Sequence, residues 1–216
     1  MLKLLNVSFH YPGGAGVNGI SLELRPSDFA LLVGRTGAGK TTLLKLISLE
    51  LTPDAGDLTL EKFRTSSMKD AHKPLWRRRL GIVHQNLQLL EDRSVLENVR
   101  LAAICEPNLN HAKARALKVL SRVHLSHKIH SYPPQLSTGE QQRAAIARAL
   151  VNEPFLLLAD EPVSNLDALT SAGIIDLLHH CSQSGMAVLV ATHQPERFES
   201  VKPIVYKMDD GRVFRQ

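Results

Sequence analysis

The sequence predicts an α/β fold: a core with a mostly parallel sheet, an N-terminal antiparallel β subdomain and an inserted α-helical subdomain. Three observations predict it. Short strand-like segments open the chain, residues 94–125 are helical in pattern, and strand-like and helical segments alternate from residue 155 to 208. Such alternation is typical of a parallel sheet covered by helices. A chain of 216 residues is long enough to bury a core.

The first elements are short segments in which apolar and polar residues alternate. They cover residues 2–11, 20–24 and 29–33, and proline and glycine separate them. We expect antiparallel, hairpin-like strands that lead into the core. After Gly39 the apolar spacing of TTLLKLISL changes to that of a helix packed on a sheet. A strand, a glycine-rich loop and a helix therefore follow one another.

The later elements begin with two helical patterns, SVLENVRLAAI and HAKARALKVLSRV, the second with Asn110 as its expected N-cap. Strands are predicted at 155–159, 186–192 and 203–208, and a helix at 171–183 that ends before Gly185. We expect a single domain over residues 1–216. Its core covers about 1–85 and 155–216, and its helical subdomain covers about 86–152.

The composition is that of a globular protein, with 44% hydrophobic and 22% charged residues. No apolar stretch approaches the ~18 residues that cross a bilayer, and no signal peptide is expected. Cys105 and Cys181 have no metal-ligand spacing, so we expect lone buried thiols and a cytoplasmic location. The net charge of +5 suits nucleotide phosphates, anionic lipid or nucleic acid. The run Arg77–Arg79 could meet anionic lipid or nucleic acid, but a run of three cations is usually just a charged face before a strand, so no role is assigned to it.

The sequence from residue 34 to 42 matches the phosphate-binding pattern G-x-x-x-x-G-K-[ST]. Its glycines let backbone N–H groups close around phosphate oxygens at the start of a helix. Lys40 is expected to pair with the β- and γ-phosphates and Thr41 to offer a hydroxyl to Mg²⁺. A glycine-rich turn with a surface lysine is the alternative. The predicted ATP-binding residues of this P-loop NTPase core are Gly34, Arg35, Thr36, Gly37, Ala38, Gly39, Lys40, Thr41 and Thr42.

Two adjacent carboxylates, Asp160 and Glu161, follow the strand-like run FLLLA. Adjacent side chains on a strand point to opposite sides, so we expect the two to have different tasks. Asp160 is assigned to Mg²⁺, and Glu161 to orienting or deprotonating the attacking water. An exposed acidic turn is the alternative.

Six motifs occur in the order found in ABC-type ATPases. They resemble the Walker A, Q-loop, signature, Walker B, D-loop and switch-histidine elements of that family, and they lie at Gly34–Thr42, Gln85, Leu136–Arg143, Phe155–Glu161, Ser164–Asp167 and His193. The resemblance covers essentially the whole chain. Within the family, the stretches 11–14, 85–99 and 161–167 are most similar to the FtsE cell-division group, with lipoprotein-release and macrolide-export ATPases as near neighbours.

The resemblance implies roles for residues that carry little signal alone. It places Tyr11 against adenine, Gln85 on Mg²⁺ and His193 at the γ-phosphate, so that Lys40, Glu161 and His193 form the catalytic set. Without it, Tyr11 would be a plain strand residue, Gln85 a loop amide and His193 a structural histidine.

Ser137 and Gly139 begin the helix of the signature motif, where a hydroxyl and bare N–H groups can bind an anion. The family fold implies that they meet the γ-phosphate on a second copy, which makes ATP the link in a head-to-tail homodimer. Taken alone, Ser137 would be only a helix N-cap. Thr138 stands where the family usually has glycine. If that position needs a positive φ, threonine costs about 1–2 kcal/mol and slows turnover several-fold.

The resemblance also implies partners. It predicts an ATPase subunit, peripheral on the inner face of the cell membrane, that works with a separate integral-membrane, permease-like subunit; nucleic acid is not expected. Two alternatives stay open: a soluble, nucleotide-gated clamp on nucleic acid, and a weakly active nucleotide-binding scaffold.

Overall fold

A computed structural model describes residues 1–103 and 109–216. The N-terminal layer is a four-stranded antiparallel sheet in the order β2-β1-β4-β5. Its strands are β1 (Leu2–His10), β2 (Gly16–Leu24), β4 (Ala55–Leu60) and β5 (Phe63–Arg64). This layer confirms the predicted antiparallel N-terminal β subdomain.

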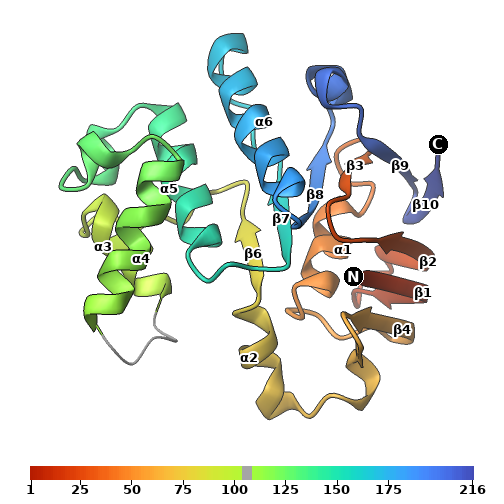
Figure 1. The fold of residues 1–216 in the computed structure, drawn as a ribbon. Coiled ribbons are helices and arrows are strands. Elements are labelled where there is room, and N and C mark those ends of the chain that lie inside the picture. Colours follow the sequence, from red (N-terminus) through yellow and green to blue (C-terminus); the bar gives the residue numbers. More distant parts are fainter. Residues whose placement is uncertain (104–108) are drawn as a thin grey trace.

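The central layer is a six-stranded sheet in the order β10-β9-β3-β8-β7-β6 (Figure 1), in which only β10 runs antiparallel to its neighbour. Its strands are β3 (Phe29–Val33), β6 (Leu80–Val83), β7 (Leu156–Asp160), β8 (Ala187–Thr192), β9 (Ile204–Asp209) and β10 (Arg212–Arg215). The mostly parallel core is confirmed. The expectation that residues 29–33 join an antiparallel hairpin is wrong, because β3 pairs in parallel with β8 and β9. Its continuous apolar run suits a strand covered on both faces.

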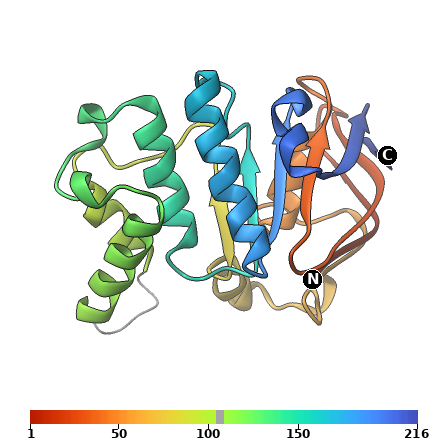
Figure 2. The ribbon, with the colours of Figure 1, turned by 45° about the horizontal axis from the view of Figure 1, so that its top comes forward.

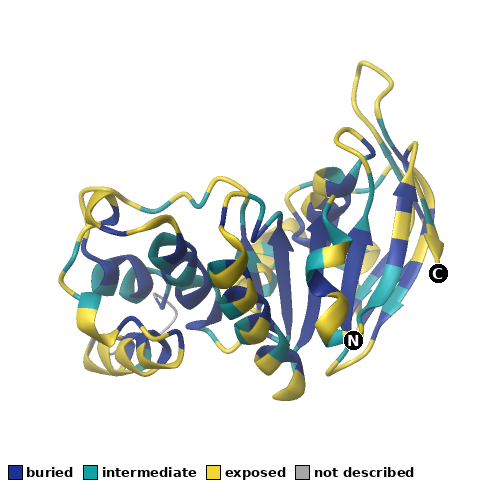
Figure 3. Ribbon diagram, turned by 90° about the horizontal axis from the view of Figure 1, so that it is seen from above, coloured by how far each residue is buried: buried dark blue, intermediate teal, exposed yellow. Residues whose placement is uncertain are grey.

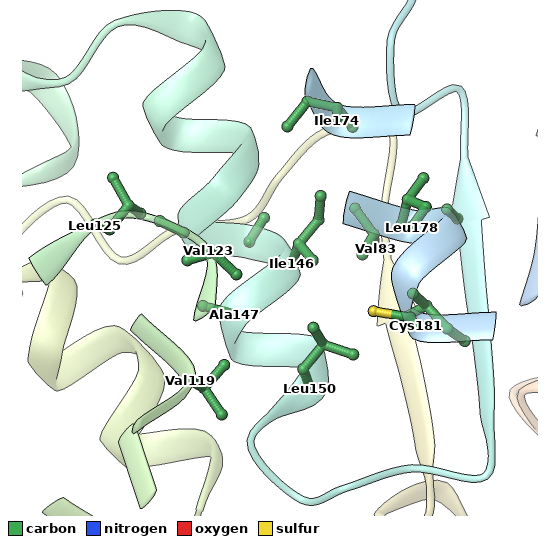
Figure 4. Close-up of a cluster of buried hydrophobic side chains, with 14 of the residues drawn as sticks. Val83, Val119, Val123, Leu125, Ile146, Ala147, Leu150, Ile174, Leu178 and Cys181 are labelled. Atoms are coloured by element: carbon green, nitrogen blue, oxygen red, sulfur yellow. The ribbon is translucent and has the colours of Figure 1, made fainter. Parts of the chain in front are cut away.

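Both faces of the inner strands β3, β7 and β8 are buried, and these strands are dark blue in Figure 3. Along β7, Leu157 and Ala159 pack among the helices on one face, and Leu156 and Leu158 pack on the other. Helix α6 (Ala168–Gln183) covers the first face, and α1 (Lys40–Ile47) and the antiparallel sheet cover the second. Figure 4 shows part of the first cluster, to which Val83, Leu178 and the buried Cys181 belong. Cys105 lies outside the described residues.

A helical insertion separates β6 from β7 in the chain. Helices α3 (Val95–Ala102), α4 (Leu109–Arg122) and α5 (Thr138–Leu150) pack together beside the sheet, and α5 lies alongside α6 (Figures 1 and 2). The N-cap prediction for Asn110 is wrong, because the helix already includes Leu109 and Asn110 lies in its first turn.

The remaining helices are short. They are α2 (Lys73–Arg77) and five 3₁₀ helices, at Thr65–Ser67, Asp70–His72, Ser126–Lys128, Pro133–Gln135 and Pro195–Val201. Among the described residues, no helix has the length and apolar character needed to cross a bilayer.

Candidate functional site

The phosphate-binding loop joins β3 to α1 and depends on two glycines. Gly37 and Gly39 have φ of 84° and 103°, in the left-handed region that glycine adopts without steric cost. Lys40 is the first residue of α1, and its side chain is only 8% exposed. Its Nζ donates hydrogen bonds to the carbonyls of Gly34 (2.7 Å) and Arg35 (3.3 Å). The ammonium group is therefore held over the phosphate-binding loop, and the backbone N–H groups of this loop lie at the N-terminus of α1.

A cavity of about 230 Å³ gathers most of the predicted site residues at the carboxyl edge of the parallel strands. It is lined by Thr36, Gly37, Gly39, Lys40, Thr41, Thr42, Gln85, Asp160, Glu161 and His193. Several predicted residues are not in its lining. Gly34, Arg35 and Ala38 lie in the loop itself, and Ser137 and Gly139 lie on α5. Tyr11 follows β1, is 36% exposed and contacts the ring of Phe9 edge to face at 4.9 Å.

Asp160 ends β7 and is joined directly to the phosphate loop. Its Oδ2 accepts a hydrogen bond from Thr41 Oγ1 at 2.8 Å. Burial raises the pKa of Asp160 above its ordinary value and the charge of Glu161 adds to this, while the Thr41 hydrogen bond and the Lys40 and His84 charges act in the opposite direction. Together with Gln85, Thr41 and Asp160 form an oxygen-donor set of the kind that Mg²⁺ takes beside phosphates.

Glu161 directly follows the strand and turns into the same cavity as Asp160. Its φ is 48°, so the strand geometry stops at Asp160 and the expectation that the two side chains point to opposite sides is wrong. Glu161 Oε1 lies 2.9 Å from His193 Nδ1 and 3.7 Å from Lys40 Nζ. Glu161 Oε2 is buried and has no hydrogen-bond partner among the described residues. A strained backbone and an unsatisfied buried oxygen are both typical of catalytic positions.

The N-terminus of α5 is accessible to solvent and capped by Ser137. Ser137 Oγ accepts a hydrogen bond from the Glu140 N–H (3.3 Å), and the Ser137 N–H donates to Glu140 Oε2 (2.9 Å). The latter bond lowers the pKa of Glu140. Ser137 and Thr138 are exposed. Gly139 is buried against α6, where an added Cβ would collide with Thr170, so close helix packing requires this glycine.

Thr138 is the first residue of α5, and its φ is not positive. The expectation of backbone strain at this position is therefore wrong. A threonine adopts the first helical position without a left-handed conformation, and the predicted several-fold loss of turnover has no basis in the backbone.

Two arginines that no sequence motif marks support the site. Arg148 of α5 donates to the carbonyls of Leu87 (2.6 Å) and Gln88 (2.5 Å), in the loop after Gln85, and burial lowers its pKa. Asn98 fixes the same loop by accepting from the Leu90 N–H (2.8 Å). The loop after Gln85 is thus bound to α5, the helix of the signature motif.

Arg197 is the second arginine. Its guanidinium donates to the carbonyls of Val163 and Leu166, both at 3.0 Å, and to Ser171 Oγ at 2.8 Å. It fixes the loop that follows Glu161 and leads into α6. Backbone carbonyls are present at every residue, so no sequence pattern marks these acceptors.

Comparison with known families agrees with this geometry. The family described as "ABC transporter" matches residues 17–164, from β2 through the loop after β7. The chain belongs to the ABC transporter family. It is an ATPase domain of that family.

Relatives of this ABC ATPase match over nearly their whole length. The cell division ATP-binding protein FtsE of Streptococcus pneumoniae (strain D39) is 39% identical over 217 residues, covering 100% of this chain and 94% of that protein. FtsE of Escherichia coli K12 is 40% identical over 215 residues, covering 99% and 97%.

Solved structures share the fold. The dimeric structure of MJ0796, a bacterial ABC transporter cassette, has a TM-score of 0.89 at 31% identity and covers 100% of this chain and 97% of its own. A dimeric post-hydrolysis structure of MJ0796 with ADP and Pi has a TM-score of 0.90 at 31% identity, covering 100% and 98%. CbiO1 of Clostridium perfringens, part of the ABC transporter complex cbiONQ, has a TM-score of 0.90 at 27% identity, covering 99% and 86%.

Proposed function

We propose that this chain is the ATP-binding and ATP-hydrolysing subunit of a membrane ABC complex. Head-to-tail closure of two copies around ATP would drive a separate integral-membrane subunit. Full-length similarity to FtsE supports a role in cell division, ahead of the related export and lipoprotein-release systems. Residues 1–85 and 155–216 would form the nucleotide-binding core, and residues 86–152 the helical subdomain that reaches the second copy.

Nucleotide binding uses the phosphate loop and Tyr11. The loop N–H groups and the Lys40 ammonium would hold the β- and γ-phosphates, and the exposed ring of Tyr11 would stack on adenine. Thr41, Asp160 and Gln85 would hold Mg²⁺, which when bound neutralises phosphate charge during transfer.

Hydrolysis uses Glu161 and His193. Glu161 Oε2, which is buried and unsatisfied, is the atom placed to accept a hydrogen bond from the attacking water and then its proton. His193 fixes Oε1 at 2.9 Å, so the carboxylate cannot rotate freely. His193 also lies after β8, at the edge where open parallel sheets bind ligands, and would contact the γ-phosphate.

One observation supports the proposal that the catalytic site is built from two copies of the chain. The N-terminus of α5 is exposed, and it does not line the cavity of its own chain. The Ser137 oxygen accepts the Glu140 N–H, and the hydroxyl proton can rotate toward a phosphate oxygen of a second copy. The positive end of the α5 dipole would stabilise the same anion. The dimeric structures of MJ0796 support this arrangement.

Coupling to the membrane subunit would use the loop after Gln85. Gln85 lines the cavity, Arg148 ties Leu87 and Gln88 to α5, and Leu90 is 45% exposed. A change at the γ-phosphate would therefore move a surface that can receive a cytoplasmic helix of the partner.

Co-purification tests this proposal. The tagged chain is expressed together with the gene that neighbours its own in the source genome, and membranes are solubilised in detergent. We expect an integral-membrane protein to co-purify, and Leu90→Glu to abolish its recovery. Leu117→Glu, at an exposed leucine (37%) on α4, is the matched control and should leave recovery intact. The proposal is wrong if no integral-membrane protein co-purifies, or if both variants behave alike.

A further inference from the structure

The positive charge of this protein is concentrated in one segment. Residues 61–79 carry two carboxylates, Glu61 and Asp70, and seven cations, for a net charge of +5, which equals that of the whole chain. The remaining residues are therefore neutral in sum. The cations of this basic segment are Lys62, Arg64, Lys69, Lys73, Arg77, Arg78 and Arg79.

Part of this charge is not neutralised within the chain. Arg64 pairs with Asp57, Lys73 with Asp70, and Arg79 with Glu61. The side chains of Lys62, Lys69 and Arg78 are exposed and make no ion pair or hydrogen bond with any described residue.

Two large apolar side chains lie among these cations. Phe63 is 56% exposed and Leu75 is 55% exposed. An exposed surface that combines cations with large apolar side chains is typical of segments that lie at a membrane interface.

The basic segment is firmly attached to the fold. Met68 and Trp76 pack against the core, and the rings of Phe63 and Trp76 are 4.8 Å apart. The Arg79 guanidinium lies 5.1 Å from the centre of the Trp76 ring. The exposed cations are therefore presented by a folded surface.

The position of the basic segment separates it from the nucleotide. Figure 1 shows α2 at the end of β6 opposite its arrowhead, whereas the cavity lies at the carboxyl ends of the strands. No residue of the segment lines the cavity. The segment is therefore not placed to hold the phosphates of an ATP bound in that cavity.

We propose that residues 61–79 bind the anionic surface of a lipid bilayer directly. The exposed leucine favours lipid over nucleic acid, because Leu75 offers no stacking surface and the rings of Phe63 and Trp76 already pack on each other. This contact goes beyond the proposed function, since it needs neither ATP nor a membrane subunit.

Trp76 gives the test a built-in probe, because it is the only tryptophan in the chain. The purified full-length chain, without any membrane partner, is titrated with vesicles of phosphatidylglycerol and phosphatidylcholine in equal parts, and with phosphatidylcholine alone. We expect a change in Trp76 emission and co-sedimentation with the anionic vesicles only, both weakened by added salt.

Vesicle binding by two double variants tests whether the basic segment makes the contact. Both variants change the net charge by the same amount. Lys69→Glu with Arg78→Glu changes two unpaired cations of the basic segment. Lys113→Glu with Lys118→Glu changes two exposed lysines of α4. Each cation near an anionic membrane contributes about 1 kcal/mol, so we expect the first variant to bind vesicles at least about 30-fold more weakly and the second nearly normally.

Three outcomes would overturn the inference. They are an absence of binding to anionic vesicles, equal losses in the two variants, and binding of duplex DNA or RNA that depends on Lys69 and Arg78 while vesicles are not bound. ATP hydrolysis by both variants should match that of the unmodified chain. Because no membrane protein is present, this test can fail while the proposed partnership stands, and the reverse also holds.

Discussion

The Ser137 hydroxyl is expected to have two roles, and the chain contains a control that separates them. It caps α5, and in the proposed dimer it donates a hydrogen bond to the γ-phosphate held by the other copy. Ser94 caps α3 through Glu97 with the same distances, 3.3 Å to the N–H and 2.9 Å to the carboxylate. Ser94 does not line the cavity. Ser137→Ala and Ser94→Ala therefore share the loss of a cap. Ser94→Ala also loses the hydrogen bond that Ser94 Oγ donates to Glu97 Oε2 (2.9 Å), and only Ser137→Ala loses a phosphate contact.

The expected magnitudes follow from the two kinds of hydrogen bond. Loss of a serine N-cap costs about 1 kcal/mol, which lowers the Tm of a chain of this size by roughly 2–4 °C. Loss of a hydrogen bond to a charged group costs about 1.5–3 kcal/mol, which corresponds to roughly 10- to 150-fold in turnover. Both alanine variants should show this decrease in the free energy of unfolding. Only Ser137→Ala should also show the decrease in turnover. Ser137→Asp, which keeps a capping oxygen but adds negative charge, should keep the stability and lose at least as much turnover.

The assay combines urea unfolding with steady-state hydrolysis at saturating ATP, well below the Tm of every variant. The reasoning is refuted if Ser137→Ala and Ser94→Ala lose the same turnover, because the hydroxyl would then be a cap only. It is also refuted if Ser137→Asp hydrolyses ATP as the unmodified chain does.

Three further predictions concern the site and its supports. Burial raises the pKa of Asp160, so its ionised form destabilises the fold, and stability falls as pH rises from the ordinary value of 3.8 through the raised pKa. At neutral pH and without nucleotide, the Tm of Asp160→Asn should therefore equal or exceed that of the unmodified chain. The variant should lose the increase in Tm that Mg²⁺ and ATP give the unmodified chain. A lower Tm without nucleotide would contradict this. Thr138→Gly should change turnover by less than about threefold, because no strain is present to relieve, and a several-fold gain would restore the strain explanation. Arg197→Ala removes three hydrogen bonds to the loop after Glu161 and its junction with α6, so it should lower the free energy of unfolding in urea by about 1–3 kcal/mol. It should also lower turnover at unchanged ATP affinity. Full activity would show that the loop keeps its conformation without Arg197.

Much of the fold could be predicted from the sequence, because local patterns decide it. The strand at 29–33 has the predicted bounds, and β7 and β8 differ from theirs by one residue. The pairing of β3 could not be predicted from its short apolar run, because such a run does not determine which strands lie on either side of it. The sequence predicts no element at residues 55–79, although β4, β5 and α2 lie there. Their patterns are short, and tertiary packing determines them.

The motifs single out the residues that line the cavity, but they do not predict the geometry of these residues. The motifs do not reveal that Glu161 leaves the strand with a positive φ, that its Oε1 meets His193, or that Lys40 folds onto the loop carbonyls. These features depend on contacts between segments far apart in the chain. For the same reason the motif points only to phosphate at Gly139 and does not reveal that Thr170 of α6 is its immediate neighbour.

The most direct test of the two-copy site is the mass of the Glu161→Gln variant in solution. This change removes the proposed base and leaves the Ser137 contact and the phosphate loop intact, so ATP stays bound and unhydrolysed. Sedimentation with Mg²⁺ and ATP should give a dimer. With ADP, or when Ser137→Asp is added, it should give a monomer. A Glu161→Gln chain that binds ATP and remains a monomer at every concentration would contradict the claim that the catalytic site is built from two copies.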